Sequence, residues 1–242
     1  MGVTVHDAPQ WFRSSFVRSA RAAGATASDD QLEDTAQQLV ERWSDERRHF
    51  HDLRHLATVL HRVDEFSQET HNPHLVRLAA WYHGAVFTVD KADTYALKGG
   101  EQTPAGAELA RKELPHLGVP SANADRVAAL VDSLLRHLPP AGDVDAQVLN
   151  DADLSMLACE PQRYKAYAQA VRAEYAHIPA RDFLRARIRI LERLLQRGSL
   201  YSTPLGRAWE GAARQNVEGE LCRLRKEQAA LAAAEAEGVA TG

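Results

Sequence analysis

Apolar residues along the chain recur mostly at spacings of three and four, the period of an α-helix. Strictly alternating stretches rich in Val, Ile and Thr, which are typical of strands, are missing. The pattern predicts one helix that starts at Ser28, one that starts near Asp52, and others over residues 10–23, 73–87, 104–114, 122–137, 151–158, 161–175, 180–197 and 206–234. The sequence therefore predicts an all-α protein, a bundle of about eight to ten helices.

The predicted helix over residues 73–87 is apolar on nearly every side, with the sequence LVRLAAWYHGAVF. Such a helix belongs in the centre of a domain, so we expect His83 to be buried. The polar, glycine-bearing residues 88–103 that follow are predicted to form an exposed loop. No break between helices has the length or composition of a linker, which predicts a single domain over residues 1–235 and a disordered tail over 236–242.

The composition narrows the function classes. A chain of 242 residues with a mean hydropathy of -0.40 has no apolar run near the ~18 residues of a membrane span. Its formal net charge of -4 argues against an extended nucleic-acid surface. Only Cys159 and Cys222 are present, far apart, which favours a cytoplasmic protein without a disulfide framework. The pattern leaves open whether the protein is a monomer or a homodimer.

The densest group of metal-capable residues is in the stretch RRHFHDLRH, which holds His49, His51, Asp52 and His55. If a helix starts near Asp52, His51 and His55 are about one turn apart and can face the same way. Imidazole and carboxylate groups together suit metals used in hydrolysis. The alternative is a solvated, histidine-rich helix start without a ligand.

Two further sites lie elsewhere in the chain. A histidine in an apolar central helix needs a hydrogen-bonding or metal partner, and this applies to His83. In NDADLSML, Asp151 and Asp153 are two apart, and buried carboxylates need a cation. The alternatives are a satisfied core histidine and a helix-capping aspartate beside an exposed one. Together with His55, these residues predict a metal centre assembled by the fold.

An ordered series of sequence motifs resembles a known protein family. In chain order they are RHFHDLRHLATVL, LAAWYHGAVF, GGEQTPAGAELA, LVDSLLRH, LNDADLSMLA, YKAYAQAVRAEY and WEGAARQNVEGEL. They cover residues 47–221, and with them the chain resembles the HD superfamily of metal-dependent phosphohydrolases, in particular a bacterial branch of predicted HD phosphohydrolases. The resemblance implies an HD-type helical domain.

The resemblance also implies a set of metal ligands. His55 matches the family's first metal-binding histidine, and His83 matches the histidine of the His-Asp doublet that names the superfamily. The last ligand falls at Asp151 or Asp153, and the sequence does not separate the two. His51 matches an additional histidine of the branch.

Two residues are implied in catalysis, and one position departs from the family. Glu101 matches an acidic residue after the loop, and His137 matches a histidine at the end of a helix. At the position of the doublet's aspartate, however, this chain has Gly84. Arg47 and Arg48, before the histidine cluster, would form either a cationic rim for phosphate or a solvated helix start.

Two functions follow as hypotheses. The first is a phosphohydrolase that uses a divalent metal (Mn, Mg, Ni, Co, Fe or Zn) on a small phosphorylated molecule or nucleotide, weakened by Gly84. The second is a catalytically degenerate HD protein that binds a phosphorylated ligand or a partner without turnover.

Overall fold

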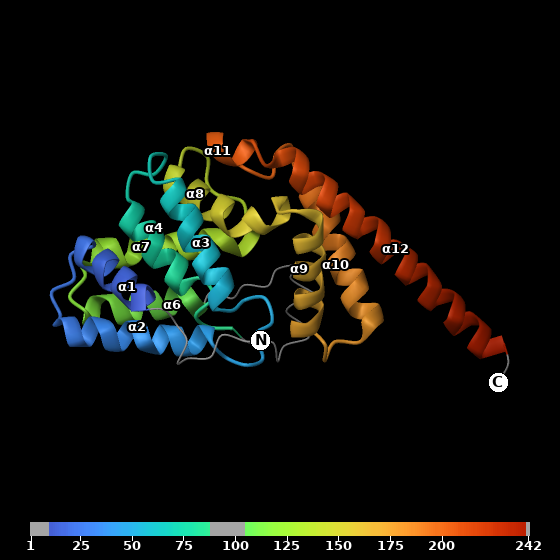
Figure 1. Cartoon of the computed structure of the whole chain (residues 1–242), viewed down its shortest axis with the longest axis horizontal. Coiled ribbons are helices and arrows are strands. Elements are labelled where there is room, and N and C mark those ends of the chain that lie inside the picture. The colour runs from blue at the N-terminus through green and yellow to red at the C-terminus, as the bar shows by residue number, and fades with distance from the viewer. Residues whose placement is uncertain (1–9, 88–104, 241–242) are drawn as a thin grey trace. The chain divides into compact units, whose positions relative to one another are not determined.

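The computed structural model describes residues 10–87 and 105–240, and every regular element in these residues is helical (Figure 1). They form eleven α-helices, the shortest of which has four residues, and two short 3-10 segments. The all-α prediction is confirmed. None of the helices in this part of the chain is long and apolar enough to cross a membrane.

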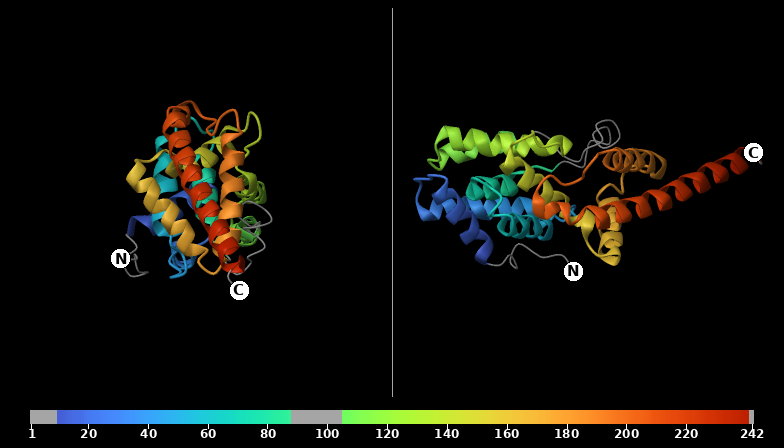
Figure 2. Two further views of the ribbon diagram at one scale, coloured as in Figure 1. Left: turned by 90° about the vertical axis from the view of Figure 1, so that its right-hand side faces the viewer. Right: turned by 90° about the horizontal axis from the view of Figure 1, so that it is seen from above.

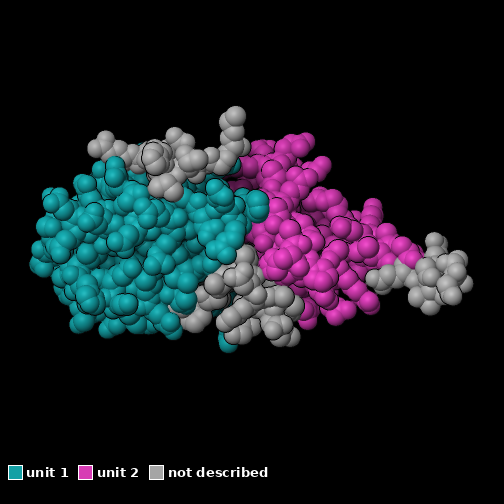
Figure 3. Space-filling model, turned by 90° about the horizontal axis from the view of Figure 1, so that it is seen from below, with its two compact units in different colours: residues 1–87, 102–155 teal, residues 88–101, 156–242 magenta. Residues whose placement is uncertain are grey.

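The described residues divide into two compact units, drawn in teal and magenta in Figure 3. Unit 1 holds residues 10–87 and 105–155, and unit 2 holds residues 156–240. Each unit is considered by itself. The single domain expected over residues 1–235 stays a prediction.

Unit 1 is built around one central helix. Its α-helices are α1 (Gln10–Ala22), α2 (Asp29–Trp43), α3 (Leu53–Glu65), α4 (Pro73–Tyr82), α6 (Ala105–His116), α7 (Ser121–Ser133) and α8 (Val144–Asp153). Helix α4 packs against α1, α3, α6, α7 and α8, while α6 and α7, in green in Figure 2, run side by side. Trp81 and Tyr82 on α4 are fully buried, and the rings of Phe12 and Phe16 of α1 meet Trp81 edge-on. The apolar helix is therefore central, as its sequence predicts.

The helix starts of unit 1 follow local capping chemistry. Ser28 accepts a hydrogen bond from the backbone N–H of Gln31, whose side chain accepts one from the N–H of Ser28, so a capping box begins α2. Asp52 caps α3 by accepting from the backbone N–H groups of Arg54 and His55. Both predicted starts are confirmed.

Several predicted helix bounds are wrong. Helix α4 ends at Tyr82 and does not reach residue 87. The short helix expected over residues 151–158 is the end of α8, which already begins at Val144 because Asp143 caps it, followed by the 3-10 segment Leu154–Ala158. The helix expected over residues 122–137 ends at Ser133 and is followed by the 3-10 turn Leu134–Arg136.

Unit 2 consists of α9 (Pro161–Glu174), α10 (Ala180–Leu195), α11 (Pro204–Arg207) and α12 (Glu210–Ala240). Helix α12 packs on α9 and α10, and its last turns extend beyond α10 (Figures 1 and 2). It continues to Ala240, within the segment 236–242 that the sequence predicts as a tail. A buried ion pair lies between these helices: Arg187 donates to Glu220 at 2.8 Å, and the hydroxyl of Tyr164 donates to the same carboxylate at 2.5 Å.

Candidate metal centre

Three buried side chains from three helices of unit 1 converge on one point. The Nε2 atom of His55 lies 3.0 Å from Oδ1 of Asp153, and Nε2 of His83 lies 3.4 Å from the same oxygen. The two Nε2 atoms are 3.2 Å apart. Among the residues that the structure describes, these three form the one group whose ligand atoms could hold a metal ion.

Each of the three candidate metal ligands lies at one end of a helix. The cap made by Asp52 puts His55 in the first turn of α3. His83 directly follows α4, and its backbone N–H still bonds to the carbonyl of Ala79. Asp153 is the last residue of α8. Helices α3, α4 and α8 contact one another in pairs, so their packing brings the three ends together (Figure 1).

The structure separates the two aspartates that the sequence left open. Residues two apart on a helix point about 200° apart, so Asp151 and Asp153 face opposite sides of α8. Asp153 joins the histidines. Asp151 is fully buried and its Oδ1 accepts a hydrogen bond from the side chain of Asn150 at 3.2 Å. It does not belong to the converging group.

The separations within the group fit a bound divalent metal. Metal bonds of about 2.1 Å to nitrogen and oxygen place neighbouring ligand atoms about 3.0 Å apart at right angles and about 3.4 Å apart at tetrahedral angles. The observed separations of 3.0, 3.2 and 3.4 Å span this range. Two imidazoles and one carboxylate are a donor set typical of transition metals and zinc.

The hydrogen bonds of the two imidazoles also fit a cation. Nδ1 of His83 lies 2.6 Å from the carbonyl oxygen of Ala80, so it carries the proton and leaves Nε2 of a neutral ring with a lone pair. Nδ1 of His55 is buried and has no hydrogen-bond partner among the described residues. If the proton of His55 is on Nδ1, that N–H has no acceptor and the two Nε2 lone pairs face each other at 3.2 Å. If it is on Nε2, the ring can donate to Asp153 at 3.0 Å and the Nδ1 acceptor stays unpaired. A cation among the three atoms would relieve the repulsion between the two lone pairs in the first case.

The electrostatics favour the forms that bind metals. Burial raises the pKa of Asp153, but hydrogen bonds and charge interactions with His55 and His83, when these rings carry a proton on Nε2, outweigh it and hold the pKa well below its usual value. Burial lowers the pKa of His55, and the nearby Asp153 only partly opposes this. At neutral pH the carboxylate is therefore ionised and His55 is neutral, as metal ligands must be.

The remaining site residues that the sequence predicts, among those that the structure describes, do not belong to the group of His55, His83 and Asp153. The ring of His51 lies 5.5 Å from that of His55 and stacks on Phe87 at 5.1 Å, beside the ligand group and outside it. His137 has a left-handed backbone with φ of 46°, and its Nδ1 lies 3.6 Å from Oδ2 of Asp153. Glu101 lies outside the described residues.

The sequence does not predict the roles of two residues that border the centre, Trp43 and Arg48. The indole ring of Trp43 is centred 5.1 Å from the ring of His83. Arg48 is 8% exposed and donates to the carbonyls of His51 and Gly84, at 2.7 and 2.9 Å. It is neither an exposed rim nor a solvated helix start, so both expectations are wrong for this residue. The sequence carries no signal for these two hydrogen bonds, because their acceptors are backbone carbonyls.

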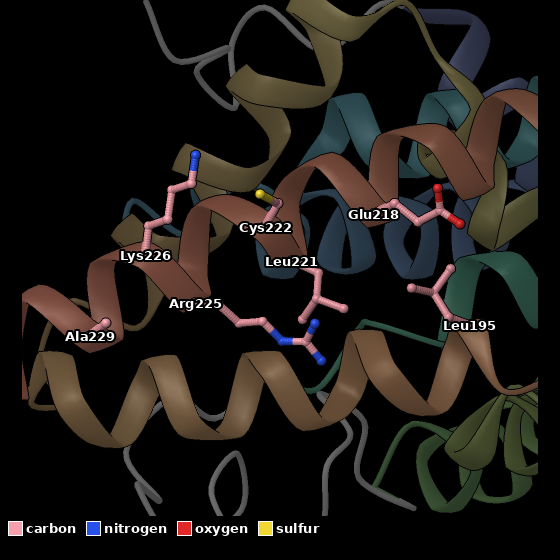
Figure 4. Close-up of a pocket in the computed structure, with 7 residues that line it drawn as sticks. All are labelled: Leu195, Glu218, Leu221, Cys222, Arg225, Lys226 and Ala229. Atoms are coloured by element: carbon pink, nitrogen blue, oxygen red, sulfur yellow. The ribbon is translucent and has the colours of Figure 1, made fainter.

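A groove in unit 2 is separate from this group of residues. It lies along α12 and the end of α10, and Figure 4 shows its lining side chains. They are Leu195, Glu218, Leu221, Cys222, Arg225, Lys226 and Ala229. None of them is a predicted site residue.

Comparisons with protein-family models, curated proteins and solved structures find no match to this chain. The resemblance to HD phosphohydrolases therefore rests on the sequence motifs. The geometry of His55, His83 and Asp153 supports a bound metal independently of these motifs.

Proposed function

We propose that this chain is an HD-type, metal-dependent phosphohydrolase that acts on a small phosphorylated or nucleotide-like molecule. The observation that carries the proposal is the convergence of His55, His83 and Asp153, whose three ligand atoms are buried and 3.0–3.4 Å apart. The motif order supports the reaction class, because His55 and His83 match metal-binding positions of that superfamily and Asp153 is one of the two candidates for its last aspartate.

The three side chains would hold one divalent ion. When bound, such an ion polarises a phosphoryl oxygen and lowers the pKa of water. Two imidazoles favour Mn, Fe, Co, Ni or Zn over Mg, which prefers oxygen ligands. The hydrogen bond from Nδ1 of His83 to Ala80 fixes the orientation of that ring and keeps its Nε2 directed to the other two ligand atoms.

His137 is the residue that we propose for proton transfer. Its side chain is 26% exposed, and its Nδ1 lies 3.6 Å from Oδ2 of Asp153, so it reaches both the centre and solvent. Imidazole is the side chain that most often gives or takes a proton in catalysis near neutral pH. Non-glycine residues with positive φ are uncommon and often belong to functional sites, and among the described residues His137 is the one case. Glu101 stays a proposed assistant.

Binding without turnover is the second candidate, and Gly84 favours it. The family resemblance implies a carboxylate at this position, and the site has none there. A centre with fewer carboxylates binds metal more weakly, which would leave a protein that recognises a phosphorylated ligand but does not cleave it.

Metal content and phosphatase activity test the proposal. Protein purified without a His-tag is analysed for metals and then assayed against a panel of phosphate esters with Mn, Mg, Ni and Co. We expect about one metal ion per chain and turnover with at least one of the metals. An intact, folded protein that retains none of these metals would refute the proposal, and metal without turnover would favour the second candidate.

The variant His83→Ala connects the metal to this site. Loss of a ligand should weaken metal binding by more than the roughly 10 to 100-fold typical of outer partners. His74→Ala is the matched control, because His74 is exposed on α4, the helix that His83 directly follows. It should leave metal content unchanged. Equal metal content in both variants would mean that His83 is structural.

A further inference from the structure

The position after His83 has no room for a side chain. A Cβ atom placed on Gly84 would lie 2.3 Å from Cη2 of Trp43 and 2.9 and 3.0 Å from two other atoms of the same ring. Ordinary contacts begin near 3.4 Å. The indole of Trp43 therefore occupies the space in which a carboxylate at this position would stand.

Trp43 is held firmly in this place. Its side chain is fully buried, and its Nε1 donates to the backbone carbonyl of Trp81 at 2.9 Å. The ring contacts both metal-ligating histidines, with centroids 5.1 Å from His83 and 6.1 Å from His55. It forms a rigid apolar wall on this side of the centre.

Arg48 packs against the ring of Trp43. Its guanidinium stacks on Trp43 at 5.1 Å and on Phe87 at 5.0 Å. One nitrogen donates to the carbonyls of His51, before α3, and Gly84, after α4. Arg48 thus joins the two segments that carry His55 and His83, and it places a permanent positive charge next to Gly84.

We propose that the centre binds a single divalent ion, with His55, His83 and Asp153 as its ligands among the described residues, because Trp43 and Arg48 close the side on which a carboxylate at position 84 would enter. The inference rests on the proposed function, which requires that the site binds a metal. Paired-metal sites hold their ions about 3.5–4 Å apart and need shared or additional ligands. Here one side is filled by an indole ring and a cation, both of which disfavour a second ion.

The ion count is the direct test. Full-length protein is titrated with Mn²⁺ while the electron paramagnetic resonance signal of free Mn²⁺ is followed, which gives stoichiometry and affinity without any substrate. We expect one ion per chain. Two ions per chain would overturn the inference and leave the proposed function standing, whereas failure to bind Mn²⁺ and, in equilibrium dialysis, Fe²⁺, Co²⁺, Ni²⁺ and Zn²⁺ would overturn both.

Two variants test the role of Trp43. In Gly84→Asp we expect no second ion, no tighter binding and a lower melting temperature, because the carboxylate has no space. In Trp43→Phe/Gly84→Asp the smaller ring makes room, and we expect binding at least about tenfold tighter than in Gly84→Asp. Trp43→Phe alone is the matched control for loss of the indole.

The variants also give clear contrary results. If Gly84→Asp alone binds Mn²⁺ tenfold tighter than the unchanged protein at an unchanged melting temperature, Trp43 does not block this position and the inference is wrong. If the double variant is folded by circular dichroism and binds no tighter than Gly84→Asp, the space beside His83 does not lead to the metal, and the inference is wrong as well.

Discussion

Replacing Gly84 by alanine tests the packing beside the candidate metal centre without adding a charge. The new methyl group would meet Cη2 of Trp43 at 2.3 Å, where ordinary contact starts at 3.4 Å. The ring or the backbone must therefore move by about 1.1 Å, the difference between these two distances. Trp43 cannot swing into solvent, since it is fully buried and bonded to the carbonyl of Trp81.

Two costs make up the expected loss of stability. Forcing an extra carbon into a packed core costs about 1–3 kcal/mol. If the ring moves far enough to lose its hydrogen bond, the buried indole N–H adds about 1–3 kcal/mol. We expect the free energy of unfolding to fall by about 2–4 kcal/mol, which lowers the melting temperature by about 5–15 °C in a chain of this length.

Urea unfolding followed by tryptophan fluorescence measures this loss. Three of the four tryptophans, Trp11, Trp43 and Trp81, are in unit 1, so the signal reports mainly on the unit that changes. Gly211→Ala on α12 is the control, because a Cβ atom there meets nothing within 4 Å and alanine favours the helix by up to about 1 kcal/mol. A Gly84→Ala protein within about 0.5 kcal/mol of the unchanged chain would refute the steric argument.

Two further predictions concern buried carboxylates. Burial raises the pKa of Asp145, but hydrogen bonds from Thr70 and Asn72 outweigh this effect and lower the pKa to about 2. This value is below the pKa of an aspartate in the unfolded chain. The stability that Asp145 provides is therefore present above about pH 4 and is lost as the pH falls toward 2. Between pH 5 and pH 2, the free energy of unfolding of the unchanged protein should fall by about 2 kcal/mol more than that of Asp145→Asn, as measured by urea unfolding at each pH. The same pH dependence in both proteins would contradict this prediction. In unit 2, Glu220→Gln removes the carboxylate that pairs with buried Arg187, and it should lower the free energy of unfolding by about 3–5 kcal/mol. Changing both residues to Met should recover most of this loss. A double variant as unstable as Glu220→Gln would contradict this reasoning.

The fold class could be predicted from the sequence because it depends on local patterns. The three- and four-residue spacing of apolar positions and the capping residues Ser28 and Asp52 act within one helix. The helix ends were harder to predict. The sequence gives no warning that α8 starts at Val144, because the cap comes from Asp143 in a stretch that also contains prolines and glycine.

The residues of the candidate site could be predicted from the sequence only in part. His55 stands out in a histidine-rich stretch and His83 as a polar residue in an apolar helix, and the structure brings the two together. The choice between Asp151 and Asp153 depends on the rotation of α8 relative to its neighbours, which no local pattern encodes. The roles of Trp43 and Arg48 depend on contacts with Trp81 and Gly84 across the fold, through backbone carbonyls that every residue possesses.

The three candidate ligands, His55, His83 and Asp153, are positioned by the packing of the helices that carry or precede them. Helices α3, α4 and α8 contact one another through apolar residues, and α4 is held on several sides by further helices of unit 1. A bound ion would therefore add to the stability of a structure that is already folded, by about 2.7 kcal/mol at a concentration of 100 times its dissociation constant. In a small domain whose core is the metal itself, loss of a ligand and loss of the fold are the same event. Here the two are separable, so the metal content of His83→Ala reports on coordination, and the unfolding of Gly84→Ala reports on packing.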